Sequence, residues 1–288
     1  MNYRHAYHAG GFADVVKHAV LCRMIAHLRQ KPAAFRVIDT HAGAGVYDLA
    51  GAEAGKTGEW RRGIGRLIGE TAQDLPAAAR ALLAPYLDAV AAVNPAGTLI
   101  AYPGSPALIQ AMLRRQDRLI ACEFEPQAAA ALASRLRGDP RAKTLAIDGW
   151  TALAAYVPPK ERRGLVLVDP PFEHPDEFSR LARGLETAHR KWPTGSYLLW
   201  YPIKDAAEVA SFTRKLSRLG IARMLRVEVI VATASADLGL RGSGLVAVNP
   251  PWTLHDELKL MLPALATVLG RGGKAKLTLD WLAGESSR

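Results

Sequence analysis

The chain has 288 residues, of which 49% are hydrophobic and 22% are charged, a composition typical of a globular protein with a substantial core. Its 37 lysines and arginines outnumber its 27 acidic residues, and the formal net charge of +10 favours a polyanionic partner over a purely basic surface only weakly. The first residues lack the apolar core of a signal peptide, and no segment approaches the ~20 apolar residues of a membrane span. These features argue against a secreted or membrane protein, and we expect a cytoplasmic one.

The cysteines and histidines show no metal-binding pattern. Cys22 and Cys122 each lie inside an apolar run, which predicts small buried thiols in a reducing compartment. No pair of Cys or His residues has the spacing of a convincing ligand set, so we expect no metal. No apolar surface helix is evident, which indicates a monomer.

In the first third of the chain, an aromatic and basic arm over 1–11 precedes a helix predicted for 12–29. The segment 35–39 is typical of a short buried strand, and a glycine-rich turn follows it. The stretch 47–96 has a different sequence pattern, with glycine-rich turns followed by a helix rich in alanine and leucine. We therefore predict a main domain formed by 1–46 and 97–288, with 47–96 as a helical insertion.

The rest of the chain alternates short apolar runs with helical segments. The predicted strands are 119–122, 144–147, 165–168 and 197–200, and the main helices between and after them are 127–137, 177–191 and 206–219. Three later strands, some of them antiparallel, are predicted at 224–231, 244–248 and 274–281. Alternating strands and helices indicate an α/β fold, a parallel Rossmann-like sheet covered by helices on both faces.

Four successive predicted strands of this sheet end in a carboxylate: Asp39, Glu123, Asp148 and Asp169. Ligands of open α/β sheets bind beyond the carboxyl ends of the strands, so these acids mark a candidate site. Gly43 and Gly45, after the first strand, let the backbone approach a ligand closely. A dinucleotide-binding fingerprint would need a third glycine where Asp48 stands, which disfavours a dehydrogenase.

Two of these acids suit an adenosyl group. Glu123 has two oxygens for the two ribose hydroxyls, although it could also be a solvated acid. Asp148 could accept from an adenine amine, although it could also cap the helix that follows. The sequence favours the ligand contacts modestly and leaves both alternatives open.

The string Asp169-Pro170-Pro171-Phe172 is the sharpest signal in the chain. Two prolines after a buried strand force a rigid turn, because proline cannot donate to the ladder. The Asp169 carboxylate and the Pro170 carbonyl can then orient both N–H bonds of an aromatic amine, and Asp169 can take the proton that leaves. Phe172 offers a face for stacking a base. The string therefore predicts methylation of the exocyclic amine of a nucleobase.

A second string, Asn249-Pro250-Pro251-Trp252, has similar chemistry. It follows two further strands after Asp169, away from the edge expected to hold the cofactor. We therefore interpret Asn249 as part of a strand-terminating turn and Asp169 as the functional residue.

Together these strings resemble the RlmJ family of bacterial 23S rRNA adenine-N6 methyltransferases over nearly the whole chain. The resemblance rests on the order of unusual short motifs, which are Tyr3-Arg4-His5, His8-Ala9-Gly10, Ala13-Asp14, Lys17-His18, Asp39 to Gly45, Tyr102 to Pro106, Asp148-Gly149, Asp169-Pro170-Pro171 and Asn249 to Trp252. It implies a class I S-adenosylmethionine-dependent methyltransferase that modifies one adenosine of protein-free 23S rRNA.

The resemblance also implies roles for individual residues. It makes Asp169 the proton acceptor and Tyr3 a substrate contact, beside the Pro170 and Phe172 contacts inferred above. It implies cofactor contacts that the strand-end argument found only in part, from His18, His41, Ser105, Glu123, Asp148, Gly149 and Asp169, with Lys17 nearby. Gly43 joins this set of candidate contacts through the glycine turn described above. The family more often has tyrosine at the position of Phe172, which retains the stacking face without the hydroxyl.

Three other functions are weighed against this one. A DNA adenine-N6 methyltransferase would use the same four residues, but the chain shows no obvious target-recognition domain. A dehydrogenase is disfavoured by Asp48, and a non-enzymatic RNA-binding module is supported only by charge and the aromatic arm. Whether Arg61, Arg62 and Arg66 of the insertion bind RNA or simply pack is left open.

Overall fold

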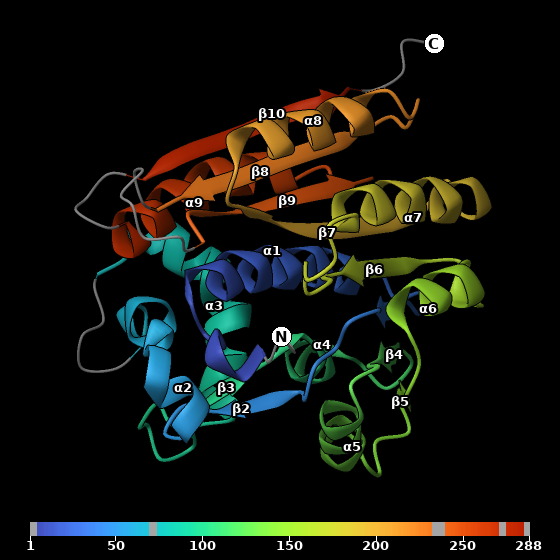
Figure 1. Ribbon diagram of the computed structural model, residues 1–288. Helices are drawn as coiled ribbons and strands as arrows, with labels where there is room; N and C mark the ends of the chain where they lie inside the picture. Colours follow the sequence, from blue (N-terminus) through green and yellow to red (C-terminus); the bar gives the residue numbers. More distant parts are fainter. Residues whose placement is uncertain (1–4, 69–73, 232–239, 271–274, 285–288) are drawn as a thin grey trace.

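The computed structural model describes residues 5–68, 74–231, 240–270 and 275–284. Its core is one sheet of eight strands in the order β10-β8-β9-β7-β6-β1-β4-β5 (Figure 1). The strands, in chain order, are β1 (Arg36–Asp39), β4 (Arg118–Cys122), β5 (Ala142–Leu145), β6 (Gly164–Val168), β7 (Ser196–Ile203), β8 (Met224–Ile230), β9 (Gly242–Val248) and β10 (Lys276–Ala283).

The sheet combines a parallel half with an antiparallel edge. Strands β7, β6, β1, β4 and β5 are parallel neighbours, whereas β9, β8 and β10 continue the sheet antiparallel to one another, with β9 also antiparallel to β7. From β1 the chain builds β4 and β5 on one side, then returns to build β6 and β7 on the other. This reversal of strand order beside β1 is the switch point of a Rossmann-like sheet, as the sequence predicts.

Helices cover both faces of the sheet. One face carries α1 (Phe12–Arg29), α3 (Ala77–Ala92), α4 (Ser105–Met112), α5 (Pro126–Arg135) and α9 (Leu254–Leu269). The other carries α6 (Gly149–Tyr156), α7 (Glu177–Lys191) and α8 (Ala206–Ser217). Alternate residues of β6 serve the two faces: Leu165 and Leu167 join the first core, and Val166 and Val168 join the second.

Helix α1 has the predicted bounds, and its buried surface is wider than a single apolar stripe. Every residue from 14 to 22 is buried, including Asp14, Lys17 and His18. The helix packs against the sheet and also against α3, α4 and α9, so little of its surface remains for solvent. Charged residues inside α1 therefore need partners from other elements, because an unpaired buried charge is costly.

The segment between β1 and α4 begins and ends at neighbouring positions of the main domain. A two-stranded sheet closes its base, where β2 (Val46–Asp48) pairs antiparallel with β3 (Ala101–Pro103). Between them lie α3 and three short elements, α2 (Ala52–Thr57), η2 (Glu59–Arg62) and η3 (Ile64–Arg66). Helix α3 packs against α1 and α9, so the segment shares the core of the sheet.

Several predicted boundaries are wrong by a few residues. The strand predicted at 144–147 is β5, at Ala142–Leu145, because its pairing with β4 starts at Ala142. The arm predicted to be irregular contains a 3-10 turn, η1 (His5–Tyr7). The two cysteines are buried free thiols, as predicted, and burial raises the pKa of each to about 12.

Candidate active site

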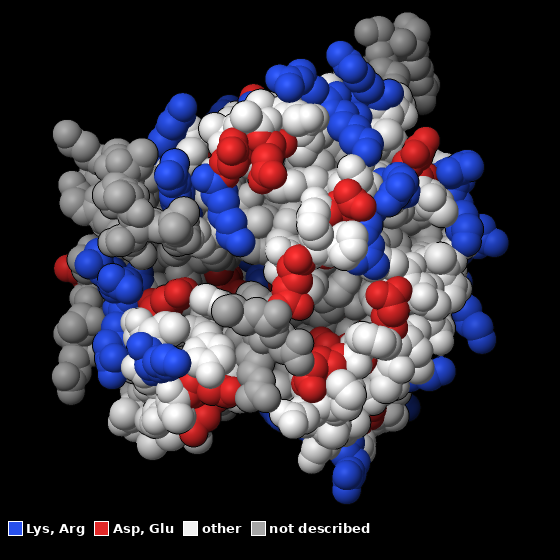
Figure 2. Space-filling view, in the orientation of Figure 1, with Lys and Arg blue, Asp and Glu red and all other residues white. Residues whose placement is uncertain are grey.

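The fold brings the four strand-end carboxylates to one edge of the sheet. Strands β6, β1, β4 and β5 are parallel neighbours, so Asp169, Asp39, Glu123 and Asp148 follow or end them at the same edge. In the orientation of Figure 1, acidic side chains gather near the middle of the molecule and basic ones mainly along its rim (Figure 2). This concentration of carboxylates favours a cationic ligand.

Lys17 connects Asp169 to helix α1. Its Nζ lies 2.5 Å from Asp169 Oδ2 and 2.8 Å from Asp14 Oδ1, and the side chain is only 4% exposed. Burial alone would favour the neutral amine, but the two carboxylates more than offset it and raise the pKa of Lys17 above its usual value. Lys17 is therefore a fixed cation that holds one oxygen of Asp169.

Asp14 holds Lys17 in place. Its Oδ2 accepts from His5 Nε2 and from the Gly10 backbone N–H, each at 3.0 Å. Burial would raise its pKa, but His5 and Lys17 hold the pKa of this carboxyl well below its usual range. In the sequence, Asp14 appears only among the motifs that carry the family resemblance, and no functional role is predicted for it. Its position three residues before Lys17 is the signal that could have identified the pair.

An aromatic cluster flanks Asp169. The Phe172 ring packs edge-on against Phe178 and Trp200, with ring centroids 4.9 Å and 5.7 Å away. Lys17 Nζ lies 5.8 Å from the centre of the Trp200 ring. Phe172 has a backbone φ of +52°, a conformation that non-glycine residues rarely adopt. Trp200 and Phe178 are not predictable as site residues from the sequence, because their apolar neighbours along the chain are equally typical of a core.

Asp39, the last residue of β1, is fully buried. Burial raises its pKa to about 7, an effect that the Ser105 hydroxyl, at the start of α4, partly opposes and the charge of Asp169 reinforces. Ser105 is itself buried, at 5% exposure. The sequence predicts Asp39 as a strand-end acid and part of a resemblance motif, but not as one of the implied cofactor contacts.

The glycine turn after β1 is tied to the end of β4. Gly43 has a φ of +62°, and a Cβ there would lie 2.1 Å from the Tyr47 hydroxyl, so only glycine fits. The Gly43 N–H donates to Glu123 Oε2 at 2.7 Å, and the Glu125 N–H donates to Glu123 Oε1 at 2.8 Å. These bonds fix the Glu123 carboxylate and leave each oxygen a further lone pair.

Asp148 does cap the helix that follows it. Its Oδ2 accepts from the Thr151 N–H at 2.9 Å and from the Thr151 hydroxyl at 3.1 Å. The next residue, Gly149, lies so close to the preceding turn that a Cβ would meet Thr40 O at 2.3 Å and the His41 ring at 2.6 Å. The cap and the close approach hold Asp148 beside His41.

The tautomer of His41 follows from its hydrogen bonds. The Thr40 hydroxyl lies 3.0 Å from Leu167 O, a carbonyl that can only accept, and 2.8 Å from His41 Nδ1. Its single proton points to the carbonyl, so His41 Nδ1–H donates to the hydroxyl oxygen. Burial lowers the pKa of His41 to about 4, and the neutral ring presents Nε2 as an acceptor.

His18 lies in a chain of buried hydroxyl groups. Its Nδ1 is 2.7 Å from the Tyr102 hydroxyl, which in turn is 3.0 Å from the Tyr86 hydroxyl of α3. Burial lowers the pKa of His18 to about 3, so the ring is neutral at neutral pH. Tyr3, the predicted substrate contact, lies outside the described residues.

Comparisons with known proteins show which family this chain belongs to. Residues 32–283 match the family model described as "Ribosomal RNA large subunit methyltransferase D, RlmJ". The chain belongs to the RlmJ family. A curated relative, Ribosomal RNA large subunit methyltransferase J of Escherichia coli, is 37% identical over 285 residues, which are 99% of this chain and all of that protein.

A second curated relative and a solved structure are similar to this chain over nearly its whole length. The Haemophilus influenzae protein of the same name is 36% identical over 286 residues, again 99% of this chain and all of that protein. A crystal structure of a Legionella pneumophila protein superposes with a TM-score of 0.87 at 32% identity, covering 97% of this chain and 99% of that one. The Rossmann-like fold is thus shared along the whole chain.

Membership of the RlmJ family makes the chain a methyltransferase with S-adenosylmethionine as its methyl donor. The site fits this donor, because its sulfonium is cationic and carboxylates gather at the strand ends. Within the described ranges, no group of three or more His, Cys, Asp or Glu side chains could hold a metal ion. No helix in that part of the chain is long and apolar enough to cross a membrane.

The second proline string of this RlmJ chain lies at the opposite edge of the sheet. Strand β9 runs antiparallel to β7, and Val248 pairs with Tyr197 near the start of β7. The Asn249 amide donates to the carbonyls of Pro193 and Gly195, each at 2.8 Å. The interpretation of Asn249 as a strand-terminating residue agrees with this geometry.

The insertion arginines differ in what they contact. Arg66 donates to the Val268 carbonyl of α9 at 2.8 Å, so it packs the insertion onto the core. Arg61 lies over the Trp60 ring, 4.9 Å from its centre, and both Arg61 and Arg62 are exposed. Of the three arginines, Arg66 therefore has a structural role, whereas the contacts of Arg61 and Arg62 do not distinguish RNA binding from packing.

Proposed function

We propose that this enzyme transfers a methyl group from S-adenosylmethionine to N6 of an adenosine in protein-free 23S rRNA. The observation that carries the proposal is the position of Asp169-Pro170-Pro171-Phe172 at the end of β6, beside the switch point of the sheet. The names of the curated relatives supply ribosomal RNA of the large subunit as the substrate class.

In the proposed reaction, Asp169 orients the amine and accepts its proton. Lys17 holds Oδ2 of Asp169, so Oδ1 and the Pro170 carbonyl are assigned to the two N–H bonds of the adenine amine. S-adenosylmethionine supplies the electrophilic methyl group. As the nitrogen gains that group it must lose a proton, and the Asp169 carboxylate is the base within reach. Phe172, backed by Trp200 and Phe178, is assigned to the base ring.

The cofactor contacts are assigned to residues around the strand ends. Glu123 is assigned to the ribose hydroxyls and Asp148 to the adenine amine, and the Nε2 acceptor of His41 is assigned to a donor of the cofactor. The remaining proposed contacts are Lys17, His18, Gly43, Ser105, Gly149 and Asp169, with Tyr3 as a substrate contact. A monomeric, cytoplasmic enzyme with 47–96 as an insertion subdomain completes the proposal.

The test is methylation by the purified chain of protein-free 23S rRNA with radiolabelled S-adenosylmethionine, in competition with double-stranded DNA. The expected result is label in N6-methyladenosine after nucleoside mass spectrometry, with DNA a poor competitor. Ribosomal RNA from cells that lack the protein should contain unmodified adenosine at the same position. Label in DNA instead, or in another nucleoside, would overturn the proposal.

A further inference from the structure

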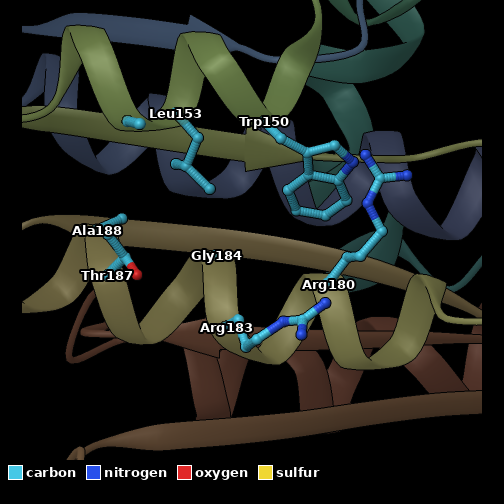
Figure 3. A pocket seen from close by; sticks show the side chains of 8 residues that line it. Trp150, Leu153, Arg180, Arg183, Gly184, Thr187 and Ala188 are labelled. Carbon is cyan, nitrogen blue, oxygen red and sulfur yellow. The ribbon is translucent and has the colours of Figure 1, made fainter.

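A groove between α6 and α7 begins beside the proposed active site. It has a volume of about 260 Å³ and is lined by Trp150, Leu153 and Ala154 from α6 and by five residues of α7. Figure 3 shows Trp150 and Leu153 pointing toward α7, and Arg180 reaching across to the Trp150 ring. The groove is therefore built from an apolar wall on one helix and a basic one on the other.

The groove is continuous with the site through two contacts. The Trp150 ring meets His41 edge-on, with ring centroids 5.4 Å apart. Helix α7 starts at Glu177, five residues after Phe172, so the proline string leads directly into its basic wall. Arg183 is six residues further on, about 9 Å along the helix at 1.5 Å per residue. A strand whose base occupies the Asp169 site can reach these side chains.

The two arginines of the groove have different surroundings. Arg180 is held in place, with its guanidinium 5.1 Å from the centre of the Trp150 ring and 3.2 Å from Glu177 Oε1. Arg183 is exposed and forms no hydrogen bond or ion pair within the described part of the chain. Thr187, one turn later, is also exposed and lines the groove. A free guanidinium beside a hydroxyl suits a phosphate oxygen.

We propose that the α6–α7 groove binds the phosphodiester backbone of the RNA strand next to the target adenosine, with Arg183 as its main phosphate contact. This inference rests on the proposed function, because it extends the same RNA beyond the Asp169 site. The net charge of +10 favours a polyanion, and Figure 2 shows basic side chains on the side of the molecule where α6 and α7 lie. Phosphate contacts position a strand without reading its sequence.

The test compares two charge reversals. Arg183→Glu changes the groove, whereas Arg115→Glu changes an exposed arginine that precedes β4 and so lies at the opposite edge of the sheet. Each variant is assayed for methylation of protein-free 23S rRNA over a range of salt concentrations. Binding of S-adenosylhomocysteine by calorimetry checks the cofactor site, and circular dichroism checks the fold.

Arg183→Glu is expected to raise the KM for RNA roughly tenfold and to reduce the slope of log KM against log salt by about one. Its Kd for S-adenosylhomocysteine should stay within about twofold of the wild type, and Arg115→Glu should match the wild type in every measurement. Equal effects of both reversals on the KM for RNA would overturn the proposed role of the groove. A changed Kd for S-adenosylhomocysteine with an unchanged KM for RNA in Arg183→Glu would also overturn it. If the wild type itself fails to methylate RNA, the proposed function fails and the groove with it.

Discussion

Two strings of nearly the same chemistry, Asp169-Pro170-Pro171-Phe172 and Asn249-Pro250-Pro251-Trp252, have opposite surroundings in this molecule. The first follows a strand of the parallel half of the sheet and meets Lys17, the acids of three neighbouring strands and an aromatic cluster. The second follows an antiparallel strand and ends at the other edge of the sheet, where backbone carbonyls accept hydrogen bonds from the Asn249 side-chain amide. The direction of the preceding strand determines whether such a turn can face the ligand.

The difference also appears in the aromatic residue of each string. Phe172 is half-buried against Phe178 and Trp200, whereas Trp252 is 80% exposed. A local motif therefore specifies a rigid turn and a set of hydrogen-bond acceptors. Whether that turn contributes to the active site or only to the stability of the fold depends on the topology of the sheet. Substitutions at the two edges of the sheet are expected to separate these roles.

The largest effect is expected for Asp169→Ala. It removes both the acceptor for the amine and the base for its proton, so methyl transfer should fall by about 10²- to 10⁴-fold in a single-turnover assay. Asn249→Ala is the matched variant at the other edge and should retain the wild-type rate within about twofold. A normal rate in Asp169→Ala would remove Asp169 from the mechanism.

Asp39→Asn is expected to stabilise the protein in a pH-dependent way. Burial raises the pKa of Asp39 from 3.8 to about 7, so the folded state binds the proton more tightly than the unfolded state. The contribution of protonated Asp39 to the free energy of unfolding is fully present below pH ~4 and is lost as the pH rises to ~7. The variant lacks this loss, so its advantage in unfolding free energy should grow by about 4 kcal/mol between pH 4 and pH 8.

Urea unfolding at a series of pH values measures this effect. The control is Asp88→Asn, since Asp88 is an exposed acid of α3 and its curve should run parallel to that of the wild type. A parallel curve for Asp39→Asn as well would show that Asp39 ionises normally in the folded protein.

Asn249→Ala is expected to destabilise the fold while leaving catalysis intact. It removes two hydrogen bonds to backbone carbonyls and places alanine at a φ of +47°, which together should cost about 2 kcal/mol of unfolding free energy. Asn249→Gly loses the same bonds but tolerates the backbone, so it should be less destabilised. Equal losses in the two variants would argue against a backbone contribution.

The smallest effect is expected for the aromatic residues. Phe172→Ala should lower kcat/KM for RNA about tenfold, because stacking of one base contributes about 1–3 kcal/mol. Trp252→Ala should change neither kcat/KM nor unfolding free energy measurably, since the ring is mostly in solvent. A fall in RNA affinity for Trp252→Ala would instead reveal a second contact surface at the far edge.

Most strands of the sheet could be predicted, because the residues that make each segment a strand are neighbours in the sequence. Buried strands of the parallel half are short apolar runs, and the acids that end them are adjacent to those runs in the sequence. Parallel pairing then places Asp39, Glu123, Asp148 and Asp169 together without any knowledge of side-chain packing. The ends of β5 could not be predicted in this way, because its register depends on its pairing with β4.

The partners of these residues could not be predicted, because they lie far away along the chain. Lys17 and Asp169 are 152 positions apart, and no pattern within α1 indicates that its lysine reaches the end of β6. His18 and His41 were identified through the family resemblance, since a buried histidine beside a hydroxyl is equally typical of a core. The Asp148 cap shows that a structural role and a proposed ligand role can fall on one carboxylate.

The pairing of β2 with β3 fixes both ends of the intervening segment at one place, independently of the exposed turns inside it. The Leu49 N–H donates to Ile100 O at 2.8 Å, and the Gly104 N–H donates to Gly45 O at 2.8 Å, so departure and return are adjacent at both ends of this pair. Residues can be gained or lost in an exposed turn of this segment, such as 95–98, without moving Gly43 away from Ser105. Variation in recognition surfaces can therefore accumulate there while the geometry at the strand ends is preserved.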